Sequence, residues 1–306
     1  MEGKFTEQRG ELAQVMERFV MKDGIHETLI PGLFFIRLSQ ISEPVHSVYQ
    51  PSLCVIAQGS KIVMLGQESY QYDSDHYLTA SVNLPISGQV VEASSNAPYF
   101  CLRLQFDMNQ ILDVIQASDL AESPNRKYGR GLAINRMNDS LHDAVMRLVR
   151  LLDSPRDIPV LAPYAIREII YRIIQDDRND TLKQFAVIGS HAQRIAMVIE
   201  RLNRDFALPL RVDELAEEAG MSESSLYYYF KEVTAMSPIQ YQKRLRLQEA
   251  RRLLLTDTME AAEAAFQVGY ESPSYFNREY ARMFGNPPIR DIQRFRDALQ
   301  TGKVLY

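Results

Sequence analysis

The sequence predicts an α+β protein in which a small β-barrel precedes an all-helical domain. Two observations lead to this class. Between about residues 33 and 106 the apolar residues recur with a period of two, in short runs separated by Gly, Pro, Asn, Asp and Ser. After residue 107 the apolar period becomes helical and stays so to near residue 299. Many short strands without a long helix between them are typical of a small barrel or sandwich.

The expected strands are the apolar runs of the first half. They span residues 33–38, 53–57, 61–65, 77–82 and 99–106. In the last run one face carries Phe100, Leu102, Leu104 and Phe106, and the other carries Tyr99, Cys101, Arg103 and Gln105. This second face either lines a pocket or meets solvent. Gly66-Gln67 indicates a hairpin turn between two runs, and an amphipathic helix is predicted before the strands over residues 5–20.

The composition fits two domains in a reducing compartment. The chain has 306 residues, 46% of them hydrophobic, and a net charge of −5. No apolar run approaches the roughly 18 residues of a membrane span. The first residues are charged and lack the apolar centre of a signal peptide. Two cysteines, Cys54 and Cys101, cannot build a disulfide framework. We therefore expect a cytoplasmic protein.

Two helical stripes follow the strands and flank the barrel. The first consists of Leu141, Val145, Leu148, Val149 and Leu152, and the wider second one of Leu161, Ile166, Ile169, Ile170, Ile173 and Ile174. These helices either cover the barrel or pair with a second subunit, and the width of the second stripe favours a homodimer. We expect the barrel domain at 1–180, a linker at 181–192 and the helical domain at 193–306.

The helical domain carries the same short pattern twice. The first copy is Ala216-x-x-x-Gly220, Ser222, Leu226, Phe230 and Ser237-Pro238. The second is Ala265-x-x-x-Gly269, Ser272, Phe276, Tyr280 and Pro287-Pro288. A small residue lets two helices approach, a glycine permits the tight turn, and a serine caps the second helix. The pattern predicts two helix-turn-helix units, which is the arrangement of a protein that inserts two helices into DNA.

Seven helices are expected in this domain. They span roughly 193–204, 212–219, 223–234, 238–254, 258–267, 273–284 and 288–299. The fourth is long enough to extend about 25 Å at 1.5 Å per residue. It separates the two units, so that their reading helices can enter successive major grooves about 34 Å apart. The domain holds equal numbers of basic and acidic residues, so any positive charge that meets DNA has to lie on one face.

From about residue 195 to 295 the chain resembles the AraC/XylS family of bacterial transcription regulators. The resemblance rests on motifs that include Gly220-Met221-Ser222, Phe230-Lys231, Ser237-Pro238, Arg244-Leu245-Arg246-Leu247, Glu249-Ala250-Arg251-Arg252, Gly269-Tyr270, Phe284-Gly285 and Pro287-Pro288. The run from Pro51 to Lys61, with Tyr72-Asp73 and His76-Tyr77-Leu78, resembles the N-terminal domain of a subgroup. The resemblance implies a cupin-like barrel that senses a small molecule or mediates dimerisation. It also implies promoter half-sites in double-stranded DNA as partner, activation of transcription, and RNA polymerase as a further candidate partner.

Candidate DNA contacts lie on the outer faces of the two reading helices. On the first helix they are Ser224, Ser225, Tyr227 and Tyr228, which match contacting sites of the family by position. On the second helix they are the residues expected to be exposed, Ser274, Tyr275, Asn277 and Arg278. Tyrosine cannot make a bidentate contact to guanine, so the first helix either positions the protein or reads bases. Arg278 suits guanine and Asn277 suits adenine, although Arg278 has a phosphate or a neighbouring acid as alternatives.

The long helix between the two units carries a run of basic residues. It consists of Lys243, Arg244, Arg246, Arg251 and Arg252. These side chains are either a solvated face with internal ion pairs, for example to Glu249, or a phosphate-contacting surface. Adjacent charges lie on different faces of a helix, so not all can reach DNA. We count Arg251 among the candidate DNA contacts.

The barrel is the expected site of a small effector, with candidate ligand-binding residues Cys54, His76, Cys101 and Arg103. Cys54 is either buried packing or a thiol that senses an electrophile or oxidant. The histidines are not clustered as metal ligands would be, and no phosphate-binding glycine loop or nucleophile elbow is present. We therefore expect no metal, no cofactor and no catalysis.

Three functional classes follow. The first is a ligand-responsive transcription regulator. The second is a DNA-binding regulator whose N-terminal domain only dimerises, so that its activity follows its abundance. The third, a cupin enzyme fused to a DNA-binding domain, is disfavoured because the metal ligands of such an enzyme are missing.

Overall fold

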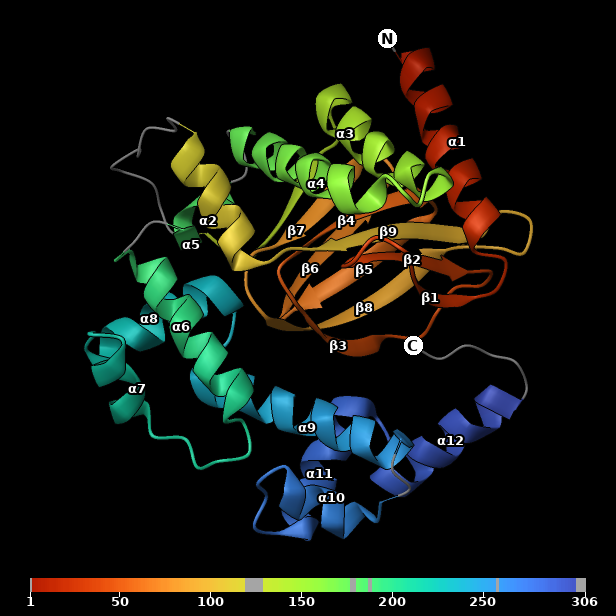
Figure 1. Cartoon of the computed structure of the whole chain (residues 1–306). Coiled ribbons are helices and arrows are strands. Elements are labelled where there is room, and N and C mark those ends of the chain that lie inside the picture. Colours follow the sequence, from red (N-terminus) through yellow and green to blue (C-terminus); the bar gives the residue numbers. More distant parts are fainter. Residues whose placement is uncertain (1, 119–128, 177–179, 187–188, 257–258, 301–306) are drawn as a thin grey trace.

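The structure is a computed structural model that describes residues 2–118, 129–176, 180–186, 189–256 and 259–300. It consists of a β-barrel domain of two sheets followed by a helical domain (Figure 1). The strands are β1 (Gly24–Glu27), β2 (Leu33–Leu38), β3 (Val45–Tyr49), β4 (Ser52–Gln58), β5 (Ser60–Leu65), β6 (Glu68–Asp73), β7 (His76–Ala80), β8 (Leu84–Glu92), β9 (Tyr99–Gln105) and β10 (Leu132–Arg136).

All pairings in the two sheets are antiparallel. One sheet has the order β1-β2-β9-β4-β7-β10 and the other the order β3-β8-β5-β6. The five predicted strands are confirmed as β2, β4, β5, β7 and β9, and the turn at Gly66-Gln67 joins β5 to β6. The expectation that the chain is only helical after residue 107 is wrong. β10 pairs with β7 and completes the edge of the larger sheet.

Helices cover the outer face of the larger sheet. These are α1 (Glu2–Phe19), α2 (Met108–Ala117), α3 (Asp139–Arg150) and α4 (Ile158–Gln175), and a short 3₁₀ turn spans Leu151–Asp153. The apolar face of β9 that carries Phe100 and Leu102 packs beneath α1, α3 and α4. Ile166, Ile169 and Ile173 of α4 are buried there. Most of the wide apolar stripe therefore covers the barrel, because a sheet flanked on both faces needs apolar residues on both.

The helical domain contains the seven predicted helices, each beginning within three residues of its expected start. They are α6 (His191–Arg204), α7 (Val212–Glu218), α8 (Glu223–Thr234), α9 (Pro238–Thr256), α10 (Ala261–Gln267), α11 (Pro273–Phe284) and α12 (Pro288–Gln300). A further helix, α5 (Asp180–Ala186), lies in the stretch expected to be a linker and packs against α2 and α6.

The core of the first helix-turn-helix unit is continuous with the barrel interior. One apolar cluster runs from the inward residues of the barrel, including Val82 and Leu84, to Phe230 and Val233 of α8 and Tyr241 of α9. The second unit has a core of its own, built from α9, α10, α11 and α12. The first unit therefore packs directly against the barrel through apolar side chains. The second unit has a separate apolar core.

The turn between β5 and β6 fits against the end of α8. Ala235 ends α8 in the left-handed region at φ 57°, and Gly66 in the turn has φ 63°. A Cβ on Gly66 would lie 2.6 Å from the carbonyl oxygen of Ala235. A glycine is thus needed here both for its conformation and for the close approach of the two domains.

We expect Gly66→Ala to loosen the docking of the first unit on the barrel. The variant combines about 1–2 kcal/mol of backbone strain with the clash against Ala235. Gly32→Ala is the matched control, because Gly32 has φ 80° and its Cβ would meet the carbonyl oxygen of Gln105 at a tolerable 3.4 Å. Hydrogen exchange of the amides at the end of α8 should accelerate only in Gly66→Ala. Equal acceleration in both variants would contradict a role for the contact.

Candidate nucleic-acid interface

The two helix-turn-helix units are built by the same local rules. α7 and α8 form the first, and α10 and α11 form the second. Ser222 caps α8 by accepting a hydrogen bond from the amide of Ser225 at 3.2 Å. Ser272 caps α11 in the same way, with the amide of Tyr275 at 3.3 Å. Ala216 and Ala265 are buried where the helices cross, and Gly220 and Gly269 turn the chain with positive φ. The repeated pattern therefore has the structural meaning predicted for it.

On α8 the predicted reading face is largely open to solvent. Ser224 is exposed, as are Tyr227 and Tyr228, and Tyr228 exposes 62% of its surface. Ser225 is half-buried against the capping Ser222. The next tyrosine, Tyr229, turns inward and stacks on the ring of His191 at 4.0 Å. The helix thus offers hydroxyl groups and aromatic edges, which suit phosphates and thymine methyl groups.

On α11 the predicted face is exposed and carries a charge. Ser274, Tyr275, Asn277 and Arg278 are all exposed, and the guanidinium of Arg278 lies 5.9 Å from the ring centre of Tyr275. Within the described residues Arg278 has no salt-bridge partner. An exposed arginine beside an exposed asparagine on a reading helix is the pair that suits guanine and adenine edges.

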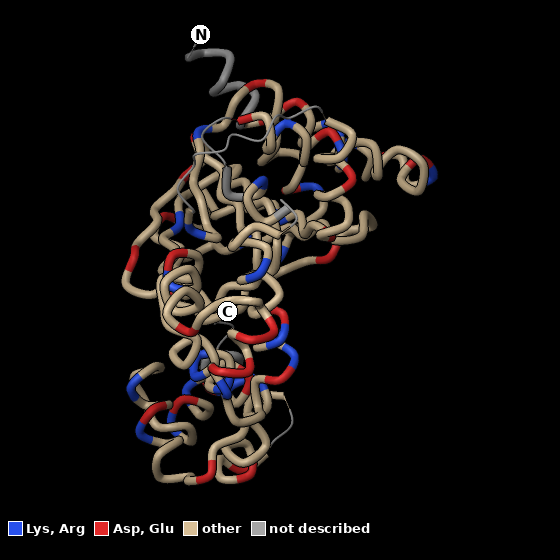
Figure 2. Tube along the Cα trace, turned by 90° about the vertical axis from the view of Figure 1, so that its left-hand side faces the viewer, with Lys and Arg blue, Asp and Glu red and all other residues tan. Residues whose placement is uncertain are grey.

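The basic residues of the run on α9 have partners within the protein, although the side chain of Arg252 is 55% exposed. Lys243 pairs with Glu279, Arg252 with Glu249 at 2.7 Å, and Arg244 donates to the carbonyl oxygen of Gly66 at 3.4 Å. Arg246 donates to backbone carbonyls of the loop before α7 and to that of Gly269. Basic and acidic residues are interspersed along the whole helical domain (Figure 2). Of the two interpretations of the run, these contacts favour internal partners.

Arg251 is held inside the second unit. Its guanidinium forms two hydrogen bonds with the buried carboxylate of Asp291, at 2.8 and 2.9 Å. The same guanidinium lies 4.4 Å from the ring centres of both Phe284 and Phe295, and its side chain is only 14% exposed. The charged pair and the two rings tie α9 to α11 and α12, so a contact between Arg251 and a phosphate requires this arrangement to open.

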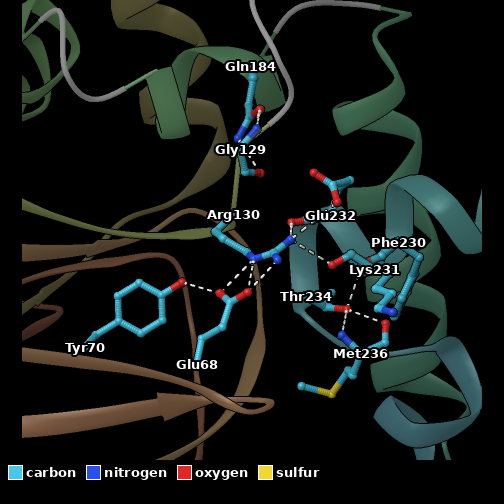
Figure 3. A network of polar contacts seen from close by, with 10 residues as sticks. All are labelled: Glu68, Tyr70, Gly129, Arg130, Gln184, Phe230, Lys231, Glu232, Thr234 and Met236. Carbon is cyan, nitrogen blue, oxygen red and sulfur yellow. Dashed lines mark hydrogen bonds and ion pairs between the residues drawn. The ribbon is translucent and has the colours of Figure 1, made fainter.

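Arg130 joins the barrel to the C-terminal end of α8 (Figure 3). Its guanidinium donates to Glu68 of β6 at 2.8 Å and, from another nitrogen, to the carbonyl oxygens of Lys231 and Glu232. Tyr70 donates to the same Glu68 carboxylate at 2.7 Å. The hydrogen bonds from Arg130 hold the pKa of Glu68 below its usual value. A cation at the last carbonyls of a helix also interacts favourably with the helix dipole.

Further hydrogen bonds complete this contact between the domains. The amide of Gly131 donates to the carbonyl oxygen of Val233 at 2.8 Å. The hydroxyl of Tyr241 donates to the backbone carbonyl oxygen of Asn83 at 2.7 Å. Sequence reasoning did not single out Arg130 or Gly131. Both lie in a connecting segment, and no local pattern marks their partners, which are about 100 residues away in the chain.

A second contact joins β3 to the second unit. The ring of His46 meets that of Phe284 edge to face, with centroids 5.1 Å apart. Burial lowers the pKa of His46 to about 4, and the positive charges of Arg251 and Arg244 act in the same direction, while Asp291 opposes them. His46 is therefore neutral at neutral pH, which is compatible with its place among arginines.

The barrel interior contains polar groups among its apolar side chains. Cys54 and Cys101 face inward and are each 1% exposed. The ammonium group of Lys61 lies beside them in the interior and donates to the hydroxyl of Tyr49 at 2.8 Å. Lys61 was not among the predicted site residues. Lys61, Val63 and Leu65 are every second residue of one strand and therefore share a face. The two apolar residues indicate that this face is turned inward.

The other predicted ligand-binding residues lie at different places. Arg103 is on the inward face of β9, half-buried, with its guanidinium 4.7 Å from the ring centre of Phe34. His76 begins β7 at the surface, where its Nδ1 atom lies 2.9 Å from the carboxylate of Asp73. The structure therefore brings Cys54, Cys101 and Arg103 to one side of the sheet and leaves His76 outside the barrel.

A surface cleft lies between α2 and α4. It has a volume of about 320 Å³ and is lined by Val114, Ala117, Ser118, Tyr164, Arg167, Glu168 and Tyr171. Beside it, Val160, Leu161 and Tyr164 of α4 remain 63%, 48% and 70% exposed. Of these three, Leu161 belongs to the second helical stripe, and it is the member of the stripe that stays exposed. Within the described part of the chain, no helix has the length and apolarity needed to cross a membrane.

A barrel followed by two helix-turn-helix units with exposed reading helices is the architecture of a DNA-binding protein with two reading helices in each chain. Residues 29–181 match the family model of the AraC-type transcriptional regulator N-terminus, and residues 215–294 match a helix-turn-helix domain model. The chain belongs to the AraC-type transcriptional regulators.

Among curated relatives, the HTH-type transcriptional activator RhaS of Escherichia coli O1:K1 / APEC is 28% identical over 175 residues. The match covers 57% of this chain and 62% of that protein, so it spans less than two thirds of the relative's length.

Among solved structures, ToxT from Vibrio cholerae O395 bound to (E)-4-(8-methylnaphthalen-1-yl)but-3-enoic acid matches with a TM-score of 0.55 and 13% identity. The match covers 84% of this chain and 96% of that chain. Unsaturated fatty acid-bound wild-type ToxT from Vibrio cholerae strain SCE256 matches with a TM-score of 0.51 and 12% identity, over 84% and 94% of the two chains. These likenesses show that the two-domain fold is shared.

We expect Arg278→Ala to reduce specific DNA binding. If Arg278 reads a base, its loss should cost about 1–3 kcal/mol on the specific site and much less on random DNA. Arg282→Ala is the control, because Arg282 is an exposed arginine of the same helix outside the predicted reading set. The measurement is a titration of the purified protein against both DNAs. Equal losses on specific and random DNA would make Arg278 a phosphate contact instead.

Proposed function

We propose that this protein is a ligand-responsive, homodimeric activator of transcription in the cytoplasm. Its function is binding rather than catalysis, and it acts at promoter half-sites, with RNA polymerase as the partner of activation. The observation that carries the proposal is the contact of the barrel with the first reading helix. A change in the barrel can move α8 relative to α11, and the spacing of two reading helices decides whether both enter the DNA.

The contact leaves the reading face open. Arg130, Gly131 and Gly66 hold the C-terminal end of α8, whereas Ser224 and Tyr228 lie nearer its N-terminal end and are exposed. Reading helices of this type contact bases with their N-terminal residues. The barrel therefore acts on the position of α8 and does not cover its surface. An effector in the barrel shifts regulation only if it favours one arrangement of the two domains.

The effector is proposed to enter the barrel interior near Cys54, Cys101 and Arg103. The inward polar groups support a ligand of mixed polarity, since they offer it hydrogen-bond partners. The binding of an unsaturated fatty acid by ToxT, a protein of similar fold, supports a small-molecule role for the N-terminal domain. The alternative is a regulator whose N-terminal domain only dimerises. It is supported by the close packing of the barrel interior, where the inward side chains form one buried cluster.

We expect Arg130→Ala to weaken operator binding by uncoupling α8 from the barrel. A coupling of 1–3 kcal/mol corresponds to a loss of about 5–150-fold in affinity. Arg136→Ala removes the same charge from an exposed position on β10 and should leave affinity unchanged. The two variants are compared on a full operator and on a single half-site. Unchanged affinity of Arg130→Ala for the full operator would refute the positioning role.

A homodimer through α4 is proposed from the exposed Val160, Leu161 and Tyr164 and the adjacent cleft. In a twofold pair the same patch on both subunits is buried. We expect the double variant Val160→Glu and Tyr164→Glu to be monomeric in light scattering, because two charges would enter an apolar contact. Leu29→Glu, at a site 67% exposed outside α4, should remain dimeric. A monomeric wild-type protein at working concentration would exclude this part of the proposal.

A further inference from the structure

The barrel interior holds two thiols that face each other across neighbouring strands. In the pairing of β4 with β9, Cys54 lies opposite Arg103 and Ile56 lies opposite Cys101. Cys54 and Cys101 are therefore diagonal neighbours on the same face of the sheet, two residues apart in register. Both belong to the apolar cluster that fills the barrel. Diagonal partners on paired strands are about 7–8 Å apart, but the two thiols hydrogen-bond with each other, so their sulfur atoms are neighbours.

An ammonium group lies in the same interior without a carboxylate partner in the described structure. Lys61 extends over Gly88, where an added Cβ would lie 2.7 Å from its Cε atom and 3.1 Å from its Nζ atom. Its described hydrogen-bond partner is the hydroxyl of Tyr49. A buried ammonium is costly unless an opposite charge balances it. Tyr49, Cys101 and Cys54 all interact electrostatically with Lys61. Burial raises the pKa of Tyr49, which leaves the thiols to supply this charge.

The two thiols differ in their ease of ionisation. Hydrogen bonding with Cys54 lowers the pKa of Cys101 to about 7, and the charge of Lys61 acts in the same direction against the effect of burial. The same hydrogen bonding and burial raise the pKa of Cys54 well above its ordinary value. The hydrogen bond between the thiols thus favours the ionisation of one over the other, with the ammonium of Lys61 beside the pair. This division is what an attacking and a resolving cysteine require.

We propose that Cys101 and Cys54 form a peroxide-reactive dithiol inside the barrel, with the ammonium of Lys61 as counter-ion of the Cys101 thiolate. The thiolate attacks one oxygen of hydrogen peroxide, the O–O bond breaks, and the leaving hydroxide takes a proton and departs as water. The sulfur, oxidised by two electrons, becomes a sulfenic acid. The sulfur of Cys54 then attacks this sulfur and the S–S bond forms. The S–O bond breaks and a second water leaves with the proton of Cys54.

The burial of the site selects the oxidant. Each cysteine is 1% exposed, so a bulky disulfide such as oxidised glutathione cannot approach, whereas hydrogen peroxide is small and uncharged. A disulfide between diagonal positions also requires β4 and β9 to shift along each other, since bridged Cα atoms lie no more than about 7 Å apart. β4 leads directly into β5 and the turn at Gly66 that contacts α8, so oxidation is connected to the first reading helix.

The test is mass spectrometry of the native full-length protein after treatment with excess hydrogen peroxide. We expect an intramolecular disulfide between Cys54 and Cys101, seen as the loss of two hydrogens and as one cross-linked peptide pair, reversed by dithiothreitol. Cys54→Ser should stop at the sulfenic acid of Cys101, seen as the addition of one oxygen to the mass of the native protein and trapped by dimedone once the protein is denatured. Native wild-type protein that keeps both thiols after this treatment, or that forms only intermolecular disulfides, overturns the proposal.

The role of Lys61 is tested by the rate of thiol loss. Lys61→Met should slow the reaction about tenfold at pH 6, below the pKa of the thiol, where one pKa unit changes the thiolate fraction by that factor. Tyr49→Phe is the matched control, because it removes the hydroxyl that Lys61 contacts and keeps the ammonium. Its rate should stay within about twofold of wild type. Equal rates in wild type and a folded Lys61→Met protein exclude the counter-ion. The dithiol is independent of the proposed function, since operator binding by reduced protein is measured separately.

Discussion

Apolar packing between the barrel and the first helix-turn-helix unit is the contact on which the rest of the structure depends. Val82 and Leu84 of the barrel belong to the same buried cluster as Phe230 and Val233 of α8. Burial of apolar surface supplies the largest favourable free energy in such an interface. The hydrogen bonds of Arg130 and Gly131 set the orientation of α8 in this interface, because each one fixes the end of α8 relative to one strand or loop. The first reading helix is thereby fixed in position relative to the barrel.

This packing makes the two halves of the helical domain unequal. The units follow one sequence pattern and have the same caps and turns, yet only the first shares its core with the barrel. The second is held through α9, through the inward-facing Arg251 and Asp291 pair, and through the edge of His46 on Phe284. Its reading helix carries the exposed Arg278, whereas α8 carries tyrosines. We propose that the first unit positions the protein on DNA and that the second reads bases.

Local patterns predicted much of this fold. The seven helices of the second domain were found because their apolar residues recur at helical spacing, and serines or prolines mark several of their starts. The five apolar strands were found for the corresponding reason. Five strands were missed, among them β6, whose residues are mostly polar, β8, which Pro85 and Gly88 interrupt, and β10, which follows a helix in the chain. Strand membership there depends on partners far away in sequence, which periodicity does not report.

The candidate site was also predictable only in part. Helical periodicity gave the exposed faces of α8 and α11, because inside and outside follow from the position of the apolar residues. The partners of the basic run on α9 were not predictable, since Glu279 and Asp291 come from other helices. The alternation in β9 separated Cys101 from Phe100, but both faces of that strand are buried, so the pattern alone did not show which one looks into the barrel.

The shared core has a consequence for how such a protein can change in evolution. A helical domain with its own closed surface can be exchanged between barrels by recombination in the linker. Here an exchange would separate Val82 and Leu84 from Val233, and Gly66 from Ala235, and leave an apolar surface on both parts. A new barrel would need a matching turn and apolar patch at once. The two domains of this protein are therefore expected to have been inherited together and to have diverged as a pair.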